Sequence, residues 1–338
     1  MSLLDVAWGA TPAGRALRLV LSPLEGAWRG VVGARNHAFD AGWRRVHATA
    51  LPCLSVGNLT VGGTGKTPMA AFLAGRLQAA GARVAIVLRG YGGDEVEVHR
   101  LLTPGATVIA NPDRVVGVAA ARATGCDVAV LDDAFQHRRA RRLSDVVLVG
   151  ADGPWPTHCL PAGPLREPWQ GLRRATLVVV TRKAVGSDAA RAVAERMRGL
   201  CAAPVATVRL ALDRLHQVGE GGGELALGAL GGRSILAVAG VGNPRAVFDQ
   251  LSQAGARVTE APFPDHHPFD AGDVAALLRR AESAEFVVST LKDAVKLHRL
   301  WPLSGPPLWY VSQRIDPEDG AVAFDEELRR VLAARASG

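Results

Sequence analysis

Short apolar runs alternate along the chain with longer stretches in which apolar residues recur every three or four positions. The short runs are typical of strands that are buried on both faces, and the longer stretches are typical of amphipathic helices. This alternation predicts an α/β fold in which a doubly wound parallel sheet carries helices on both faces. We expect a strand just before residue 60, further strands over 84–88, 127–131, 146–149 and 177–180, and helices over 68–80 and 114–123.

A glycine-rich segment interrupts the alternation, and a second series of elements then begins. Residues 219–223 are glycine at all but one position, which is typical of a linker. Beyond it we expect strands over 235–239, near 258 and over 286–289, and helices over 244–254 and 271–281. The chain is therefore predicted to contain a first α/β/α domain over 51–210, a linker over 211–232 and a second, smaller α/β domain over 233–338.

Residues 1–50 are rich in tryptophan and arginine and are assigned to the first domain as an amphipathic helical N-terminus. Ser22, Pro23 and Glu25 match a helix start, with Ser22 as N-cap and Glu25 closing a capping box. One face of this helix is apolar, and it comprises Leu24, Ala27, Trp28, Val31 and Val32. Such a face can lie in a membrane interface, or it can pack on the protein's own core, and the sequence leaves both open.

The composition is that of a globular protein with a reducing environment. Its 338 residues are 48% hydrophobic and 21% charged, and the four cysteines are too scattered for a disulfide framework or a structural zinc site. No apolar run reaches the roughly 18–20 residues of a membrane-spanning helix, and we find no secretory signal. We therefore expect a cytosolic protein, or one attached to the cytosolic side of a membrane. The net charge of +7 favours anionic partners.

The candidate chemistry begins at the glycine-rich segment that follows the first strand. It is close to the phosphate-binding pattern G-x-x-x-x-G-K-[ST], with a threonine at the first position. Its backbone N–H groups and the following helix N-terminus favour an anion, Lys66 is placed to reach the β- and γ-phosphates, and Thr67 to bind Mg²⁺. This predicts a P-loop NTPase-like fold whose nucleotide-binding residues are Thr60, Val61, Gly62, Gly63, Thr64, Gly65, Lys66 and Thr67.

Further polar residues follow the ends of predicted strands, where open α/β sheets bind their ligands. Arg89, Asp94 and Glu95 follow one strand, and Asp132 and Asp133 follow another. Acidic residues placed like Asp132 and Asp133 can hold Mg²⁺ or its waters, although aspartate is also common in caps and turns. The basic run over 137–142 lacks an aromatic platform, so we favour a solvated or anion-lining surface over nucleic-acid binding.

Adjacent histidines carry the chemistry of the second half of the chain. His266 and His267 follow Asp265, but neighbours in sequence rarely supply two ligands to one metal ion. We favour a histidine that acts in proton transfer, with a helix cap near Asp270 as the alternative. The segment over 240–243 resembles a dinucleotide fingerprint but lacks its third glycine, so we discount it.

Together these motifs resemble one family, the tetraacyldisaccharide 4'-kinases, also called lipid A 4'-kinases. The matching segments run in the family's order over most of the chain: VGNLTVGGTGKTP (56–68), RGYGG (89–93), GDE (93–95), DDAFQH (132–137), LPAGPLRE (160–167), AGVGNP (239–244), DHHPF (265–269) and KDAVKL (292–297). Three details differ from the family's usual pattern. RGYGG and GDE overlap at Gly93, Ala134 replaces a glycine, and Leu291 stands where a glutamate is common.

The resemblance implies ATP- and Mg²⁺-dependent phosphorylation of the 4'-hydroxyl of a tetraacyl glucosamine disaccharide 1-phosphate, in a cleft between two α/β/α domains. It implies that Asp94 and His266 act on the acceptor hydroxyl. It implies a metal environment of Thr67, Asp132, Asp133 and Glu167, and a substrate and phosphate environment of Asn58, Arg89, Glu95, Gln136 and Arg166. It also implies a peripheral protein at the cytoplasmic face of the inner membrane, with no nucleic acid and no obligate protein partner.

Two other functions use parts of the same residues. A nucleotide-switched, membrane-associated regulator needs only the phosphate loop, Asp132 and Asp133, and the basic N-terminus. It leaves the RGYGG and DHHPF segments without a role. A kinase for a small soluble metabolite would need no amphipathic N-terminus.

Overall fold

The computed structural model describes residues 8–9, 11–90, 93–219 and 222–335. Its centre is one mixed sheet with the strand order β10-β9-β11-β12-β7-β6-β5-β1-β4-β2-β3, and β8 pairs with β7 outside this path. The strands are β1 (Cys53–Asn58), β2 (Val84–Leu88), β3 (Thr107–Ala110), β4 (Val128–Asp132), β5 (Ser144–Gly150), β6 (Leu177–Arg182), β7 (Val205–Gln217), β8 (Glu224–Ala226), β9 (Ser234–Ala239), β10 (Arg257–Pro262), β11 (Phe286–Thr290) and β12 (Leu308–Asp319).

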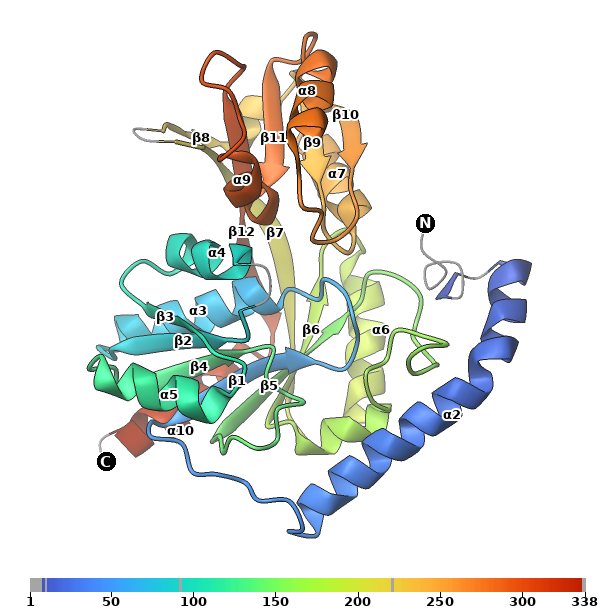
Figure 1. The fold of residues 1–338 in the computed structure, drawn as a ribbon, viewed down its shortest axis with the longest axis vertical. Helices are drawn as coiled ribbons and strands as arrows, with labels where there is room; N and C mark the ends of the chain where they lie inside the picture. The colour runs from blue at the N-terminus through green and yellow to red at the C-terminus, as the bar shows by residue number, and fades with distance from the viewer. Residues whose placement is uncertain (1–7, 10, 91–92, 220–221, 336–338) are drawn as a thin grey trace.

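Helices cover the sheet in two separate groups (Figure 1). The α-helices are α2 (Pro12–Asp40), α3 (Lys66–Ala79), α4 (Asp94–Leu102), α5 (Arg114–Ala123), α6 (Ser187–Arg198), α7 (Pro244–Gln253), α8 (Ala271–Arg280), α9 (Leu291–Leu297) and α10 (Ala321–Arg335). Two 3-10 helices, η1 (Trp169–Arg174) and η2 (Leu227–Leu230), complete the elements. The strands and helices predicted from the apolar pattern are confirmed, with ends that shift by a few residues.

The sheet is divided into two lobes that share a long ribbon. The N-terminal lobe contains β1 to β6, whose strands pair in parallel, and the C-terminal lobe contains β9 to β11, also parallel. β7 and β12 pair antiparallel along nearly their whole lengths, from Gln217 opposite Trp309 to Thr207 opposite Asp319, and they run through both lobes (Figure 1). The predicted doubly wound parallel sheet is therefore confirmed for each lobe, and an antiparallel ribbon joins the two.

Two predicted domain limits differ from this arrangement. The predicted linker 211–232 begins inside β7, because its first seven residues belong to that strand, which pairs with β12. The C-terminal end of the predicted second domain instead belongs to the N-terminal lobe. There Phe324, Leu328 and Val331 of α10 pack into the core of α3 and the central strands.

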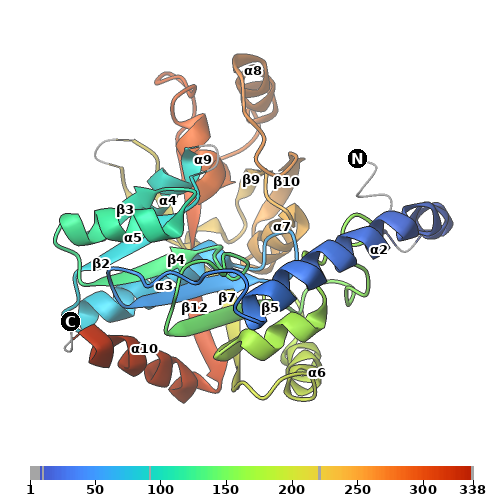
Figure 2. The same cartoon turned by 60° about the horizontal axis from the view of Figure 1, so that its bottom comes forward.

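Helix α2 lies along one side of the N-terminal lobe (Figures 1 and 2). It begins at Pro12 with Thr11 as N-cap, so the predicted start at Ser22 is wrong. Pro23 cannot donate to the carbonyl of Leu19, and the hydroxyl of Ser22 does so instead at 2.8 Å, which lets the helix continue. Glu25 closes no capping box. It is buried and accepts the backbone N–H of Cys159 at 2.8 Å.

The apolar face of α2 is divided between the protein and solvent. Val32 is buried, and Trp28 donates its indole N–H to the carbonyl of Arg166 at 2.9 Å. Leu24 and Val31 instead point outward, 58% and 65% exposed, and Leu19 and Val20 extend this outer face. No helix in the described part of the chain is long and apolar enough to cross a bilayer.

Candidate active site

The phosphate loop joins β1 to α3 at the carboxyl edge of the sheet. Gly65 adopts a left-handed conformation (φ 90°) as the N-cap of α3, where a Cβ would lie 2.4 Å from the side chain of Leu210. Asn58 donates to the hydroxyl of Thr64 at 2.8 Å, and Lys183 donates to the carbonyl of Gly63 at 2.6 Å. The loop therefore has a fixed shape, held by side chains from β1 and from the end of β6.

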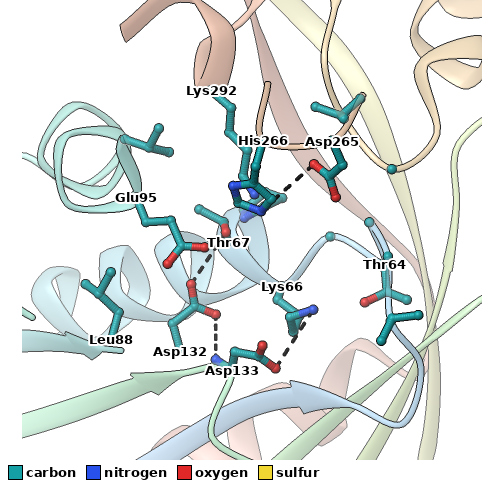
Figure 3. Close-up of a pocket in the computed structure, with 18 of the residues that line it drawn as sticks. Thr64, Lys66, Thr67, Leu88, Glu95, Asp132, Asp133, Asp265, His266 and Lys292 are labelled. Atoms are coloured by element: carbon teal, nitrogen blue, oxygen red, sulfur yellow. Dashed lines mark hydrogen bonds and ion pairs between the residues drawn. The ribbon is translucent and has the colours of Figure 1, made fainter. Parts of the chain in front are cut away.

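Lys66 points from the first turn of α3 toward the acidic pair that follows β4 (Figure 3). Its Nζ lies 3.9 Å from Oδ1 of Asp133. Burial lowers the pKa of the Lys66 ammonium, and the Asp133 carboxylate opposes that shift. Asp133 is also held by Arg166, which donates to both of its oxygens at 2.7 and 3.0 Å. The ammonium group of Lys66 is thus directed at the acidic pair, inside the cavity that the phosphate loop lines.

Asp132 is held in place by three hydrogen-bonding groups. Its Oδ1 accepts the backbone N–H of Asp133 at 2.8 Å, and its Oδ2 lies 2.8 Å from Nε2 of His99 and 3.5 Å from the hydroxyl of Thr67. Burial disfavours the charge, but the hydrogen bond with His99 and the nearby Lys66 outweigh it, so the pKa of Asp132 lies below its usual value. The carboxylate is therefore ionised and has a fixed orientation beside Thr67.

These oxygen atoms fit a magnesium ion. Among the residues that the structure describes, no three His, Cys, Asp or Glu side chains form a metal cluster. Mg²⁺ in nucleotide sites, however, takes only one or two protein oxygens and completes its shell with water and phosphate. The Thr67 hydroxyl and the ionised Asp132 carboxylate supply that number, next to the phosphate loop.

Glu167, which the sequence placed in the metal environment, has other partners. Its side chain is fully buried, and both of its oxygens accept from Arg174, at 2.8 and 2.9 Å. Asn36 of α2 and Gln136 also donate to it, each at 3.0 Å. With these contacts Glu167 joins α2 to the edge of the site, so we leave it out of the metal ligands that we propose below.

Asp94 and His266 come together from different lobes. Asp94 is the first residue of α4, and its Oδ2 lies 3.8 Å from Nδ1 of His266, which belongs to the loop after β10. The neighbouring His267 is instead bonded to Asp273 at 2.7 Å, inside the capping box of α8. Only the first histidine of the pair therefore faces the site, and the carboxylate beside it is almost completely buried.

The remaining predicted side chains lie around this centre. Glu95 points into it, and burial raises the pKa of its carboxyl while Lys292 of α9 opposes the shift (Figure 3). Gln136 donates to the carbonyl of Asn58 at 2.8 Å, and Arg89 lines the same cavity. Tyr91 and Gly92 of the RGYGG segment lie outside the described residues.

A cavity of about 880 Å³ is lined by most of these groups, although not by Asn58, Asp94 or Glu167. Its walls come from the phosphate loop, from the C-terminal lobe through His266 and Lys292, and from the inner face of α2 through Trp28, Val32 and Arg35. Several functional candidates that sequence reasoning missed line it or support it. They are Arg35, His99, Arg114, Lys183 and Lys292. None of these five residues belongs to a phosphate-binding or acid–base motif. Lys292 alone lies in one of the segments that carry the family resemblance, KDAVKL.

Known proteins match this chain over nearly its whole length. A family model described as tetraacyldisaccharide-1-P 4'-kinase matches residues 17–333. A tetraacyldisaccharide 4'-kinase of Anaeromyxobacter dehalogenans is 38% identical over 88% of this chain and 86% of its own. One of Alkalilimnicola ehrlichii is 37% identical over 93% of this chain and 92% of its own.

The fold has a counterpart among solved structures. A crystal structure of LpxK from Aquifex aeolicus in complex with ATP aligns with a TM-score of 0.72 and 26% sequence identity. The alignment covers 94% of this chain and 99% of that protein. Both lobes, the ribbon between them and the site are therefore within the matched length.

Proposed function

This chain belongs to the tetraacyldisaccharide-1-P 4'-kinase family, and from that premise we propose how its side chains share the reaction. The reaction is ATP-dependent phosphorylation of the 4'-hydroxyl of a tetraacyl disaccharide 1-phosphate, a precursor of lipid A. One observation carries the assignment of roles. The cavity that contains the phosphate loop is also lined by His266, which lies beside the buried carboxylate of Asp94. The donor groups and His266 thus share one space, with the Asp94 carboxylate beside the histidine.

On the donor side, the loop over 60–67 holds the ATP phosphates, and Lys66 stabilises the negative charge of the transferring phosphoryl group. Thr67 and Asp132 would hold Mg²⁺, which when bound neutralises charge on the β- and γ-phosphate oxygens. Arg166 donates to the Asp133 carboxylate, and Nζ of Lys66 lies 3.9 Å from Oδ1 of the same carboxylate. We propose that Asp133 sets the position of the lysine.

On the acceptor side, Asp94 accepts the proton of the attacking hydroxyl at its Oδ2 as the new O–P bond forms, while the bond from the γ-phosphorus to the bridging oxygen breaks and ADP leaves. Nδ1 of His266 lies 3.8 Å from that oxygen, close enough to orient the carboxylate or to pass its proton to solvent. His266 is half exposed, so it has the solvent contact that the buried Asp94 lacks.

The regulator and the soluble-metabolite kinase are not favoured, since the family match spans both lobes. The direct test is to incubate the purified protein with ATP, Mg²⁺ and tetraacyl disaccharide 1-phosphate in mixed micelles. We expect a lipid product heavier by one phosphoryl group in mass spectra. A tight preference for GTP without lipid product would instead support the regulator. Equal use of a fully deacylated acceptor would support the soluble-metabolite kinase.

We further propose that the protein is peripheral to the cytoplasmic face of the inner membrane and that the outer face of α2 contacts lipid. The outward side chains of Val20, Leu24 and Val31 form an apolar stripe at helical spacing, and the exposed Leu19 lies to one side of it. A stripe of this kind inserts into the interface when the helix lies flat on a bilayer. The acyl chains of the acceptor can then remain in the bilayer while its sugars enter the cavity on the other side of α2.

Replacing both Leu24 and Val31 by glutamate is expected to weaken binding to phosphatidylglycerol-containing vesicles by at least about tenfold, because each buried apolar side chain contributes about 1.5–3 kcal/mol. Co-sedimentation measures the effect. The matched control is Val322→Glu, which replaces a 73% exposed apolar residue on α10. Unchanged vesicle binding in the double variant, or an equal loss in the control, would contradict a membrane role for α2.

A further inference from the structure

Where α2 lines the cavity, it contributes an arginine that does not use all of its hydrogen-bond donors. Arg35 lies near the C-terminal end of α2 and lines the cavity. Its Nη2 donates to the side-chain oxygen of Asn36 at 3.2 Å, whereas its Nε is buried and has no hydrogen-bond partner among the described residues. A buried guanidinium N–H that has no acceptor lowers the stability of the folded protein. It is expected where a ligand supplies the acceptor.

The charges around Arg35 also favour a bound anion, because most of them are positive. Arg174, Arg138 and Arg44 act on it as like charges, and burial together with these charges lowers the pKa of its guanidinium, although Glu167 opposes the shift. The two carboxylates in this region already have their own partners. Glu167 is paired with Arg174, and Asp40 with Arg138 at 2.6 Å. Within the described chain, no carboxylate lies within ion-pair distance of Arg35.

Side-chain contacts link this end of the cavity to the phosphate loop. Asn36, next to Arg35, donates to Glu167, and Glu167 accepts from Gln136. Arg166 then connects Gln136 to Asp133, which lies 3.9 Å from Lys66. Arg35 is thus linked to the phosphoryl-transfer centre through a few side chains, and it lines the same cavity.

The acceptor has its reactive hydroxyl on one sugar and its phosphate at the far end of the other. We propose that Arg35 binds the 1-phosphate of the acceptor, with its Nε–H and an Nη–H directed at phosphate oxygens. This proposal rests on the proposed function. Helix α2 then has two tasks, because its outer face contacts lipid and its inner face fixes the charged end of the same substrate. The 4'-hydroxyl is placed at Asp94 when the 1-phosphate is held at Arg35.

The test combines a change in the protein with a change in the acceptor. Wild type and Arg35→Gln are assayed in nonionic micelles with tetraacyl disaccharide 1-phosphate and with the matched acceptor that carries a 1-hydroxyl. For the 1-phosphate acceptor we expect Arg35→Gln to raise KM about tenfold to hundredfold, the effect of losing a hydrogen bond between charged groups. For the 1-hydroxyl acceptor, wild type and variant should have KM values within about twofold of each other.

Three controls make the result specific. Arg15→Gln removes an exposed arginine of the same helix that does not line the cavity, and it should leave both KM values unchanged. Arg35→Lys should restore part of the affinity for the 1-phosphate acceptor. ATP binding and the thermal unfolding midpoint of each variant show whether it is folded.

Distinct outcomes overturn distinct conclusions. If Arg35→Gln raises KM equally for both acceptors, Arg35 supports the fold of the cavity and binds no phosphate. If Arg15→Gln causes the same loss, the effect comes from general attraction of anionic lipid. Transfer to neither acceptor by folded wild type would overturn the proposed function itself, and this inference with it.

Discussion

Asp94→Asn is expected to lower kcat by about 10²–10⁴-fold, the usual contribution of a general base, while ATP affinity changes by less than about twofold. The amide has nearly the same shape as the carboxylate but cannot take the proton of the attacking hydroxyl. Asp94 is almost fully buried at the start of α4, with only His266 of the other lobe within ion-pair distance among the described residues. Initial rates of lipid phosphorylation and a fluorescent ATP analogue measure the two quantities.

Comparison with variants of neighbouring groups separates chemistry from folding. His266→Asn should cost less than Asp94→Asn, and the double variant should be little slower than Asp94→Asn alone, since both groups act on one proton. Asp265→Asn is the matched control, because that half-exposed carboxylate lies 3.9 Å from the other nitrogen of His266. A kcat for Asp94→Asn within tenfold of wild type, or an equal loss in Asp265→Asn, would rule out Asp94 as the base.

The structure brings the predicted donor-side residues together around one cavity, and the sequence could indicate them because its signals are local. A phosphate loop between a buried strand and a helix has a fixed spacing, and Lys66 and Thr67 follow from it. Asp132 and Asp133 were predicted for a similar reason, since Asp132 ends an apolar strand and Asp133 follows it. The buried parallel strands are apolar without interruption, so the core of each lobe was also predictable.

The ribbon of β7 and β12 escaped prediction because its pairing is not local. The two strands lie about a hundred residues apart in the chain, and half of their positions are polar or exposed. The glycine-rich segment just after β7 suggested a linker that started too early. The start of α2 was misplaced because Ser22 and Pro23 match a helix N-terminus in sequence, whereas the structure uses the serine to satisfy a carbonyl within the helix.

His99 and Arg35 show a second reason why some residues of the site could not be predicted from the sequence. Each is a polar helix residue that belongs to no motif, and its role depends on groups distant in sequence that the fold places around it. His99 reaches Asp132 from the helix that begins with Asp94, so it ties the acceptor side to the metal-binding side. The one local signal was a histidine among the apolar residues of α4, which is more often a surface or core residue than part of a site.

Lys66→Met is expected to lower kcat by about 10²–10³-fold, as the loss of one preorganised donor to a developing charge does. The side chain keeps most of its length and loses its charge. The effect should be larger on kcat than on ATP affinity, because charge on the transferring oxygens is greatest in the transition state. Single-turnover transfer from ATP labelled at the γ-phosphate measures the chemical step.

Lys183→Met is the matched control for this prediction. Lys183 is also a lysine with its pKa lowered by burial, and it also belongs to the cavity, but its ammonium donates to the carbonyl of Gly63. It therefore supports the shape of the loop, so its loss should weaken ATP binding more than it slows the chemical step. If the two variants lost kcat equally, the geometry of the loop would explain the loss, and Lys66 would have no special charge to supply. A large loss confined to Lys66→Met would identify its ammonium as the group that stabilises the transferring phosphoryl.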